Sequence, residues 1–288
     1  MELRHIATRE GRLSSFLKDE MGMSTSLMNK LKWQDKIFVN GVARHNDYQV
    51  NIGDVITASL DEPTPEYPAE DGELTVLYED DHILAVDKPA GMLIHPSRAT
   101  MRGTLANRVI AYYQKTGQKA AFHPITRLDR DTFGIVLLAK NAYVHAKLNE
   151  LHTQGKLQKT YQALVFGGPE ADNGIIDAPI ARRELPSLLR YVNQDGKPSV
   201  TEFRVLERTE KTCLLALRPI TGRTHQLRVH CAYRGFPILG DPQYGSEESK
   251  AFSAELGLKH QLLCAKSLEF AHPITGVAMS LTSQLKIT

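Results

Sequence analysis

Residues 127–139, RLDRDTFGIVLLA, carry the strongest indication of how this chain folds. The stretch passes from a polar turn into the apolar run Ile135–Ala139, which is the pattern of a fully buried strand. The turn places the carboxylate of Asp129 next to that strand and between Arg127 and Arg130. A neighbouring guanidinium favours the ionised form of a carboxylate, and an ionised carboxylate held in this way can act as a nucleophile. Most such turns are solvated charge pairs, so these residues alone leave both interpretations open.

The composition excludes several classes of protein. The chain has 288 residues, is 42% hydrophobic and carries a formal net charge of +2, which suits one large and one small domain. It has no apolar run of about 18 residues and no signal-peptide core at its N-terminus, so we expect no membrane span and a cytoplasmic location. Cys213, Cys231 and Cys264 are far apart and odd in number, which argues against a disulfide framework or a zinc site.

Residues 74–288 alternate between strand and helix patterns. Antiparallel pairing is favoured by a turn signal at Asp195-Gly196 and by two adjacent strands, so the pattern predicts an α+β fold with a mixed, largely antiparallel sheet and flanking helices. We expect helices at 103–115, 142–154 and 224–234, and strands at 74–78, 82–87, 134–140, 159–166, 200–207 and 212–218.

Residues 1–60 are predicted to form a small separate α/β domain. Leu13, Phe16, Leu17 and Met21 have helical spacing, and Gly22 follows as a C-terminal stop. Ser24 or Thr25 can cap a second helix, after which Asn40-Gly41 gives a hairpin signal. Residues 24–46 contain four basic residues and one acidic residue, Asp35, so this segment carries a net charge of +3. This excess suits a phosphate-facing surface as well as a solvated helix face, and its basic residues are Lys30, Lys32, Lys36 and Arg44.

Residues 61–73 join the two predicted domains. They contain six acids, three prolines and no basic residue. Such a composition cannot build a core, so we expect an extended, self-repelling linker.

A second polar cluster lies at 221–230, TGRTHQLRVH. Arg223 stands at the predicted helix start, where an anion, either an RNA phosphate or the carboxylate of Asp129, would sit. His225 and His230 are five residues apart, too far around a helix to share one ligand face. We therefore expect no metal, one packed histidine and one in polar contacts.

The N-terminal order of two short helices, a V-N-G hairpin and an I-G-D-V-I turn resembles the S4-type RNA-binding domain. Residues 74–288 resemble the RluA-type family of RNA pseudouridine synthases. The family's R-L-D-x-x-T-x-G, K-x-Y and T-G-R-T-H-Q-L-R-V-H motifs stand at 127–134, 159–161 and 221–230. An S4-like module commonly accompanies this family, and ribosomal RNA is then favoured over transfer RNA as the substrate.

The resemblance implies roles for individual residues. Asp129 becomes the nucleophile, Tyr161 the tyrosine that stacks on the base and helps to remove the C5 proton, and Arg223 the basic partner of Asp129. Leu263 becomes the apolar residue against the uracil. Further substrate contacts are implied for Arg127, Leu128, Thr132, His95 and His225.

The isomerisation of uridine to pseudouridine can be carried out with a single catalytic carboxylate, as the sequence offers in Asp129. The C1′–N1 bond breaks, the uracil turns and C1′ joins C5, so no atom is gained and no cofactor or metal is required. A glycoside hydrolase needs a carboxylate pair and water, whereas water here would release the free base. The target base must leave its stack, which favours structured RNA with loops, and we expect a monomeric enzyme. The sequence leaves three reaction routes open: attack of Asp129 at C1′, attack at C6 and a glycal route. Two alternative functions also remain, a non-catalytic RNA-binding factor and a nucleoside hydrolase.

Overall fold

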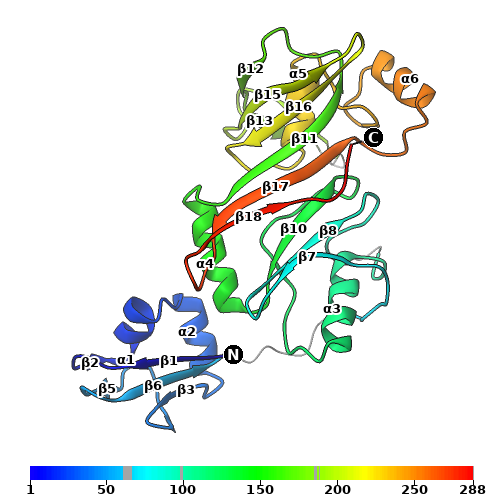
Figure 1. Ribbon diagram of the computed structural model, residues 1–288. Coiled ribbons are helices and arrows are strands. Elements are labelled where there is room, and N and C mark those ends of the chain that lie inside the picture. The colour runs from blue at the N-terminus through cyan, green and yellow to red at the C-terminus, as the bar shows by residue number, and fades with distance from the viewer. Residues whose placement is uncertain (61–66, 98–99, 185–186, 188, 288) are drawn as a thin grey trace.

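Residues 75–282 build a mixed ten-stranded sheet (Figure 1). The structure, a computed structural model, describes all residues except 61–66, 98–99, 185–186, 188 and 288. The main path of the sheet runs β12 (Asn173–Asp177), β15 (Val200–Arg208), β16 (Thr212–Pro219), β11 (Gln158–Phe166), β17 (Leu263–Ala271), β10 (Phe133–Ala139), β8 (Ile83–Lys88) and β7 (Thr75–Glu79). Two further strands, β9 (His123–Pro124) and β18 (Ala278–Thr282), pair with β10 and β17.

All neighbouring strands of this sheet are antiparallel except β10 and β17. The prediction of an α+β fold with a largely antiparallel sheet is therefore confirmed. The sequence prediction missed β17, β18 and β12, together with the hairpin of β13 (Ile180–Arg182) and β14 (Arg190–Val192).

The parallel contact between β10 and β17 depends on a glycine. Gly134 lies opposite Ala265 and has φ of +107°. A Cβ atom built at Gly134 would meet the carbonyl oxygen of Ala265 at 2.4 Å. Any side chain here would push the two strands apart, so glycine fixes how closely the polar turn before β10 approaches the start of β17.

Both faces of the central strands are covered. Val136 and Leu138 of β10 pack in the cluster that contains Leu105 and Val109 of α3 (Leu105–Lys115). The alternate residue Leu137 belongs to the cluster on the opposite face. That second cluster includes side chains of α4 (Ala142–Thr153), and Figure 1 shows α4 between the sheet and the N-terminal strands. The other helices within described residues 75–282 are α5 (Gln226–Tyr233) and α6 (Glu247–Glu255).

The N-terminal residues form a second sheet of order β1 (Glu2–Ile6), β6 (Val55–Ser59), β3 (Ile37–Val39) and β4 (Val42–Ala43). Asn40 and Gly41 both have positive φ, 51° and 78°, as the predicted hairpin turn requires. The Ser24 hydroxyl accepts a hydrogen bond from the Leu27 N–H and caps the second helix. The other elements are β2 (Gly11–Arg12), β5 (Gln49–Val50), α1 (Leu13–Ser15), the π-helix η1 (Phe16–Glu20) and α2 (Thr25–Lys32).

The N-terminal unit is docked against α4. The Tyr143 hydroxyl of α4 donates a hydrogen bond of 2.7 Å to the carbonyl oxygen of Met21. Buried side chains of both regions, among them Met21, Leu27, Tyr143 and Val144, belong to one hydrophobic cluster. A shared core of this kind stabilises a defined orientation of the two parts.

Part of the predicted linker is bonded to α3. Residues 61–66 lie outside the described residues, but the Glu70 carboxylate accepts a hydrogen bond of 2.7 Å from the Gly103 N–H. The carbonyl oxygen of Pro68 accepts one of 2.7 Å from the Asn107 amide. The segment around Pro68 and Glu70 is therefore tied to the catalytic domain by contacts that composition alone did not reveal. No helix in the described part of the protein is long and apolar enough to cross a membrane.

Candidate active site

A cleft of about 570 Å³ opens where the turn before β10 meets β11, the start of β17 and the N-terminal end of α5. Asp129 is the one carboxylate among the described residues that line it. The cationic side chains that line the same cleft are Arg127, Lys159, Arg218, Arg223 and Arg228. A groove with this excess of positive charge attracts a polyanion.

The turn that carries Asp129 is anchored by the side chain of Lys88, at the end of β8. The Lys88 side chain is fully buried, and its ammonium donates hydrogen bonds of 2.9 Å to the carbonyl oxygens of Pro89, Met92 and Arg130. Burial lowers the pKa of Lys88 to about 8, against the opposing charges of Asp131 and Asp129. This lysine therefore ties the turn to the end of β8.

Thr132 anchors the other end of the turn. Its hydroxyl accepts a hydrogen bond of 2.6 Å from the Gln261 amide, and both side chains are buried. Gln261 precedes β17, the strand that brings Leu263 to the cleft. The resemblance suggested substrate contact for Thr132, but its hydroxyl in this structure joins two walls of the cleft.

The basic partner of Asp129 is Arg228. Its Nη1 lies 3.2 Å from Asp129 Oδ2. The prediction that Arg223 makes this ion pair was wrong, because the exposed Arg223 donates instead through Nε to the Pro198 carbonyl oxygen at 3.2 Å. The structural reason is that Arg228 lies on α5, which begins at Gln226 beside the turn that carries Asp129, whereas Arg223 lies in the loop before the helix.

Arg228 is itself held by a second carboxylate. Its Nε and Nη2 donate hydrogen bonds of 2.7 and 2.8 Å to the two carboxylate oxygens of Asp241. Nη2 also donates to Gln243 Oε1 at 2.8 Å, and the guanidinium lies 4.9 Å from the Tyr244 ring centroid. Burial opposes the charged form, but the bonds to Asp241 and the charge of Asp129 outweigh it and raise the pKa of Arg228.

His225 lies beside the same carboxylate. It precedes α5 with φ of 59°, a backbone conformation that is uncommon for a residue other than glycine. Its Nε2 is 3.8 Å from Asp129 Oδ2, and its Nδ1 is 2.7 Å from the Tyr244 hydroxyl. Burial, together with the charge of Arg228, lowers the pKa of His225 although Asp129 opposes the shift.

Tyr161 and Leu263 belong to the apolar part of the cleft. Tyr161 follows an irregularity in the pairing of β11 with β17, and Leu263 begins β17. Burial, reinforced by the charge of Asp129, raises the pKa of Tyr161. Its hydroxyl therefore keeps its proton at neutral pH, and the ring presents a neutral aromatic face.

Not every residue predicted from the sequence lines the cleft. Arg127 and Leu128 do, but His95 does not. The His95 ring instead packs edge-on against Phe122 at 5.3 Å between centroids, and burial together with the charge of Arg127 lowers its pKa. The predicted RNA-binding residues lie elsewhere, in the N-terminal unit: Lys30, Lys32, Lys36 and Arg44.

The sequence predicted that one of the two histidines of the motif is packed, and in the structure the buried one is His230. His230 is fully buried, with Nδ1 at 2.9 Å from Thr201 Oγ1 and Nε2 at 3.0 Å from the Ala178 carbonyl oxygen. Across the part of the protein that the structure describes, no group of three or more His, Cys, Asp or Glu side chains is placed to hold a metal ion.

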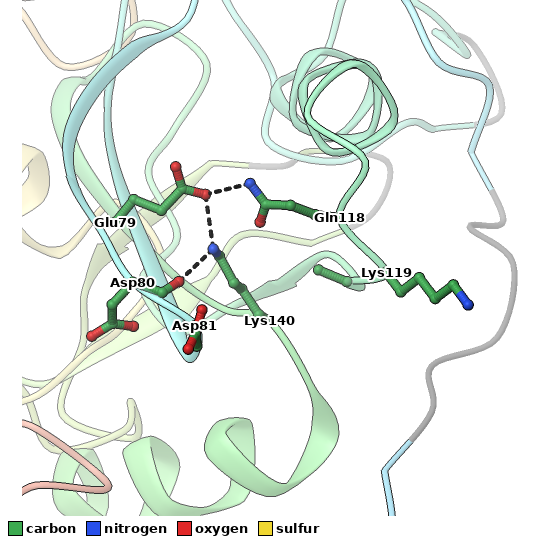
Figure 2. Close-up of a pocket in the computed structure, with 7 residues that line it drawn as sticks. Glu79, Asp80, Asp81, Gln118, Lys119 and Lys140 are labelled. Carbon is green, nitrogen blue, oxygen red and sulfur yellow. Dashed lines mark hydrogen bonds and ion pairs between the residues drawn. The ribbon is translucent and has the colours of Figure 1, made fainter. Parts of the chain in front are cut away.

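A smaller pocket, of about 450 Å³, lies at the end of the β7–β8 hairpin (Figure 2). There the buried Lys140 ammonium pairs with the Glu79 carboxylate at 2.8 Å and donates to the Asp80 carbonyl oxygen. The Gln118 amide donates to the same Glu79 carboxylate at 2.9 Å. Burial opposes ionisation of Glu79, but these bonds outweigh it and lower its pKa. These polar groups bond to one another, which is typical of a structural tie rather than a site.

Comparison with known proteins identifies the family. The RNA pseudouridylate synthase family matches residues 82–233, a range that contains Asp129, Tyr161 and Arg228. The chain is 38% identical over 245 residues to the uncharacterized RNA pseudouridine synthase YlyB of Bacillus subtilis, covering 84% of this chain and 79% of that protein. It is 31% identical over 287 residues to the ribosomal large subunit pseudouridine synthase C of Vibrio cholerae, covering 96% and 90%. The chain belongs to the RNA pseudouridylate synthase family and is of the RluA type.

Solved structures agree with this assignment. The human RNA pseudouridylate synthase domain containing 4 superposes with a TM-score of 0.60 at 26% identity, covering 74% of this chain and 88% of that one. The human RNA pseudouridylate synthase domain containing 1 has the same fold, with a TM-score of 0.62 at 22% identity over 77% of this chain and 93% of that one. The protein is thus an isomerase that acts on RNA, and the predicted enzyme class is confirmed.

Proposed function

We propose that Asp129 is the nucleophile that converts uridine to pseudouridine in the cleft. The observation that carries this proposal is the geometry of one carboxylate, held by Arg228 at 3.2 Å, in a cleft that it shares with Tyr161 and Leu263. A single carboxylate suits an isomerisation that excludes water, whereas hydrolysis of a glycosidic bond uses a pair. Arg228 pairs with the Asp129 carboxylate and orients it before the substrate arrives.

Tyr161 and Leu263 hold the flipped uracil between an aromatic and an apolar side chain in this proposal. Because burial raises the pKa of Tyr161, its hydroxyl carries its proton at neutral pH. In this proposal the Tyr161 ring contacts the base, and its hydroxyl helps to remove the C5 proton by passing its own proton to solvent as it accepts that one. Arg127, Arg218, Arg223 and Lys159 contact the phosphates on either side of the target nucleotide.

The proposed substrate is ribosomal RNA, at uridines in loops or strained helices. The names of two relatives support it: the ribosomal large subunit pseudouridine synthase C of Vibrio cholerae and the ribosomal large subunit pseudouridine synthase D of Nitrosomonas europaea. Residues 1–60 act as an S4-like unit that holds the RNA near the cleft. The residues proposed to contact phosphates in this unit are Lys30, Lys32, Lys36 and Arg44.

The test compares two neighbouring carboxylates. RNA made with uridine tritiated at C5 releases tritium when C1′ joins C5, so the label reports the reaction directly. Asp129→Asn abolishes tritium release and leaves RNA affinity within about twofold, because a neutral amide of the same size fills the site. Asp131→Asn is the matched control, since Asp131 lies in the same turn but does not line the cleft. Activity that survives in Asp129→Asn contradicts the assignment.

A further inference from the structure

The one tryptophan of the protein, Trp33, is among its most exposed side chains. It ends α2, and 79% of its surface is accessible. The opposite face of α2 is buried through Leu27, Met28 and Leu31. Tryptophan is normally a highly buried residue type. Because this indole does not pack into the hydrophobic core beneath α2, its exposure suggests that it contacts another molecule.

The backbone that carries Trp33 is rigid. The Trp33 N–H donates to the Asn29 carbonyl oxygen at 3.2 Å, in the last regular helical bond. The helix then closes with the Asp35 N–H on the Lys32 carbonyl oxygen and the Lys36 N–H on the Leu31 carbonyl oxygen, with Asp35 at φ of 51°. This pattern is a Schellman motif. Little entropy is lost when a side chain on such a fixed helix end binds a partner.

The surroundings of the indole are basic. The Lys32 ammonium lies 5.3 Å from the centroid of the Trp33 ring, and Lys30 is exposed on the same helix. An exposed aromatic face beside lysines matches a nucleotide, whose base stacks on the ring while its phosphate meets the ammonium groups. A protein surface offers no comparable regular array of negative charge.

We propose that Trp33 is a stacking platform for an unpaired base of the RNA substrate. The inference rests on the proposed role of residues 1–60 in RNA binding, and it does not depend on the role of Asp129. The base must be unpaired, because the faces of bases within a duplex are covered by their neighbours. The N-terminal unit thus recognises a loop or single-stranded segment in addition to helical phosphates.

Trp33 provides its own probe, since its emission is the only tryptophan fluorescence of the protein. The full-length enzyme is titrated with a single-stranded oligoribonucleotide of about 12 nucleotides and, separately, with the blunt duplex of the same sequence. Free tryptophan corrects for absorption by the RNA, and the anisotropy of end-labelled RNA gives binding independently. We expect the single strand to quench the emission with the same midpoint as the anisotropy change, and the duplex to leave the emission unchanged.

Substitutions separate stacking from general apolar contact. Trp33→Leu weakens single-strand binding about tenfold, whereas Trp33→Phe retains most of it, because only an aromatic ring stacks on a base. Leu256→Ala, at another exposed apolar residue that ends a helix, is the matched control and binds like the wild type. Three outcomes overturn the proposal for Trp33 without touching the proposed function: binding of the single strand without quenching, equal quenching by the duplex, and wild-type affinity of Trp33→Leu. A wild-type protein that binds neither RNA contradicts the proposed role of the N-terminal unit as well.

Discussion

Replacing Asp241 tests whether the Arg228 clamp positions the proposed nucleophile. The side chains of Arg228 and Asp241 are 6% and 1% exposed and share two hydrogen bonds. Asp241 Oδ1 accepts hydrogen bonds of 2.9 and 3.1 Å from the backbone N–H groups of Gln243 and Tyr244. Asp241→Asn keeps one side-chain oxygen that can accept these two bonds. It removes the charge and turns an N–H donor toward the guanidinium. Breaking a buried ion pair from one side costs about 3 kcal/mol.

The expected result is a fall in Tm of about 6 °C, at roughly 2 °C per kcal/mol for a protein of this size. The released Arg228 also disturbs Asp129, so kcat for tritium release falls about 100-fold at saturating RNA while the Kd for RNA is unchanged. Asp172→Asn is the matched control, because Asp172 pairs with Arg208 at 3.0 Å but is 81% exposed. That pair contributes less than about 1 kcal/mol. Equal Tm shifts in the two variants, or a normal kcat in Asp241→Asn, would refute the reasoning.

Three further changes probe other parts of the cleft. Gly134→Ala forces a Cβ toward the Ala265 carbonyl oxygen at 2.4 Å, and chemical denaturation should show a loss of ~3 kcal/mol; a loss smaller than about 1 kcal/mol contradicts the close-approach argument. Burial lowers the pKa of Lys159 to about 8, so its charge is present below that pH and lost above it. The Kd for RNA should therefore rise between about pH 7 and pH 9, and Lys159→Arg should remove that rise; an identical pH profile in this variant excludes the lysine. Arg223→Ala should weaken RNA binding and reduce its salt dependence with kcat retained, whereas Arg228→Ala should lose kcat; similar kinetics in the two variants would contradict the assignment of Arg228.

The strands and helices that carry the site were predictable because their patterns are strong. The apolar run 135–139 became β10, buried along its whole length. The Asn40-Gly41 turn and the Ser24 cap were found for the same reason, since each depends on local backbone chemistry. The strand β17 was missed although it carries Leu263, because its sequence LCAKSLEFA is neither an unbroken apolar run nor a strict alternation of apolar and polar residues.

The identity of the arginine partner could not be read from the sequence. Arg223 and Arg228 lie in one motif, and only the tertiary structure shows that Arg228, on α5, is the one that meets Asp129. Asp241 is brought to Arg228 by tertiary structure, and nothing in its local sequence signals the contact. The signal available for Arg228 was its place in the same motif as Arg223, at 221–230.

The central claim is that Asp129 converts uridines of ribosomal RNA to pseudouridine. Its most direct test is reverse-transcription mapping of carbodiimide-treated total RNA from cells with and without the gene. We expect specific ribosomal RNA stops to vanish on deletion, to return with the wild-type gene or Asp131→Asn, and to stay absent with Asp129→Asn. Stops that return with Asp129→Asn would contradict the nucleophile assignment, and stops that change only in transfer RNA would contradict the proposed substrate.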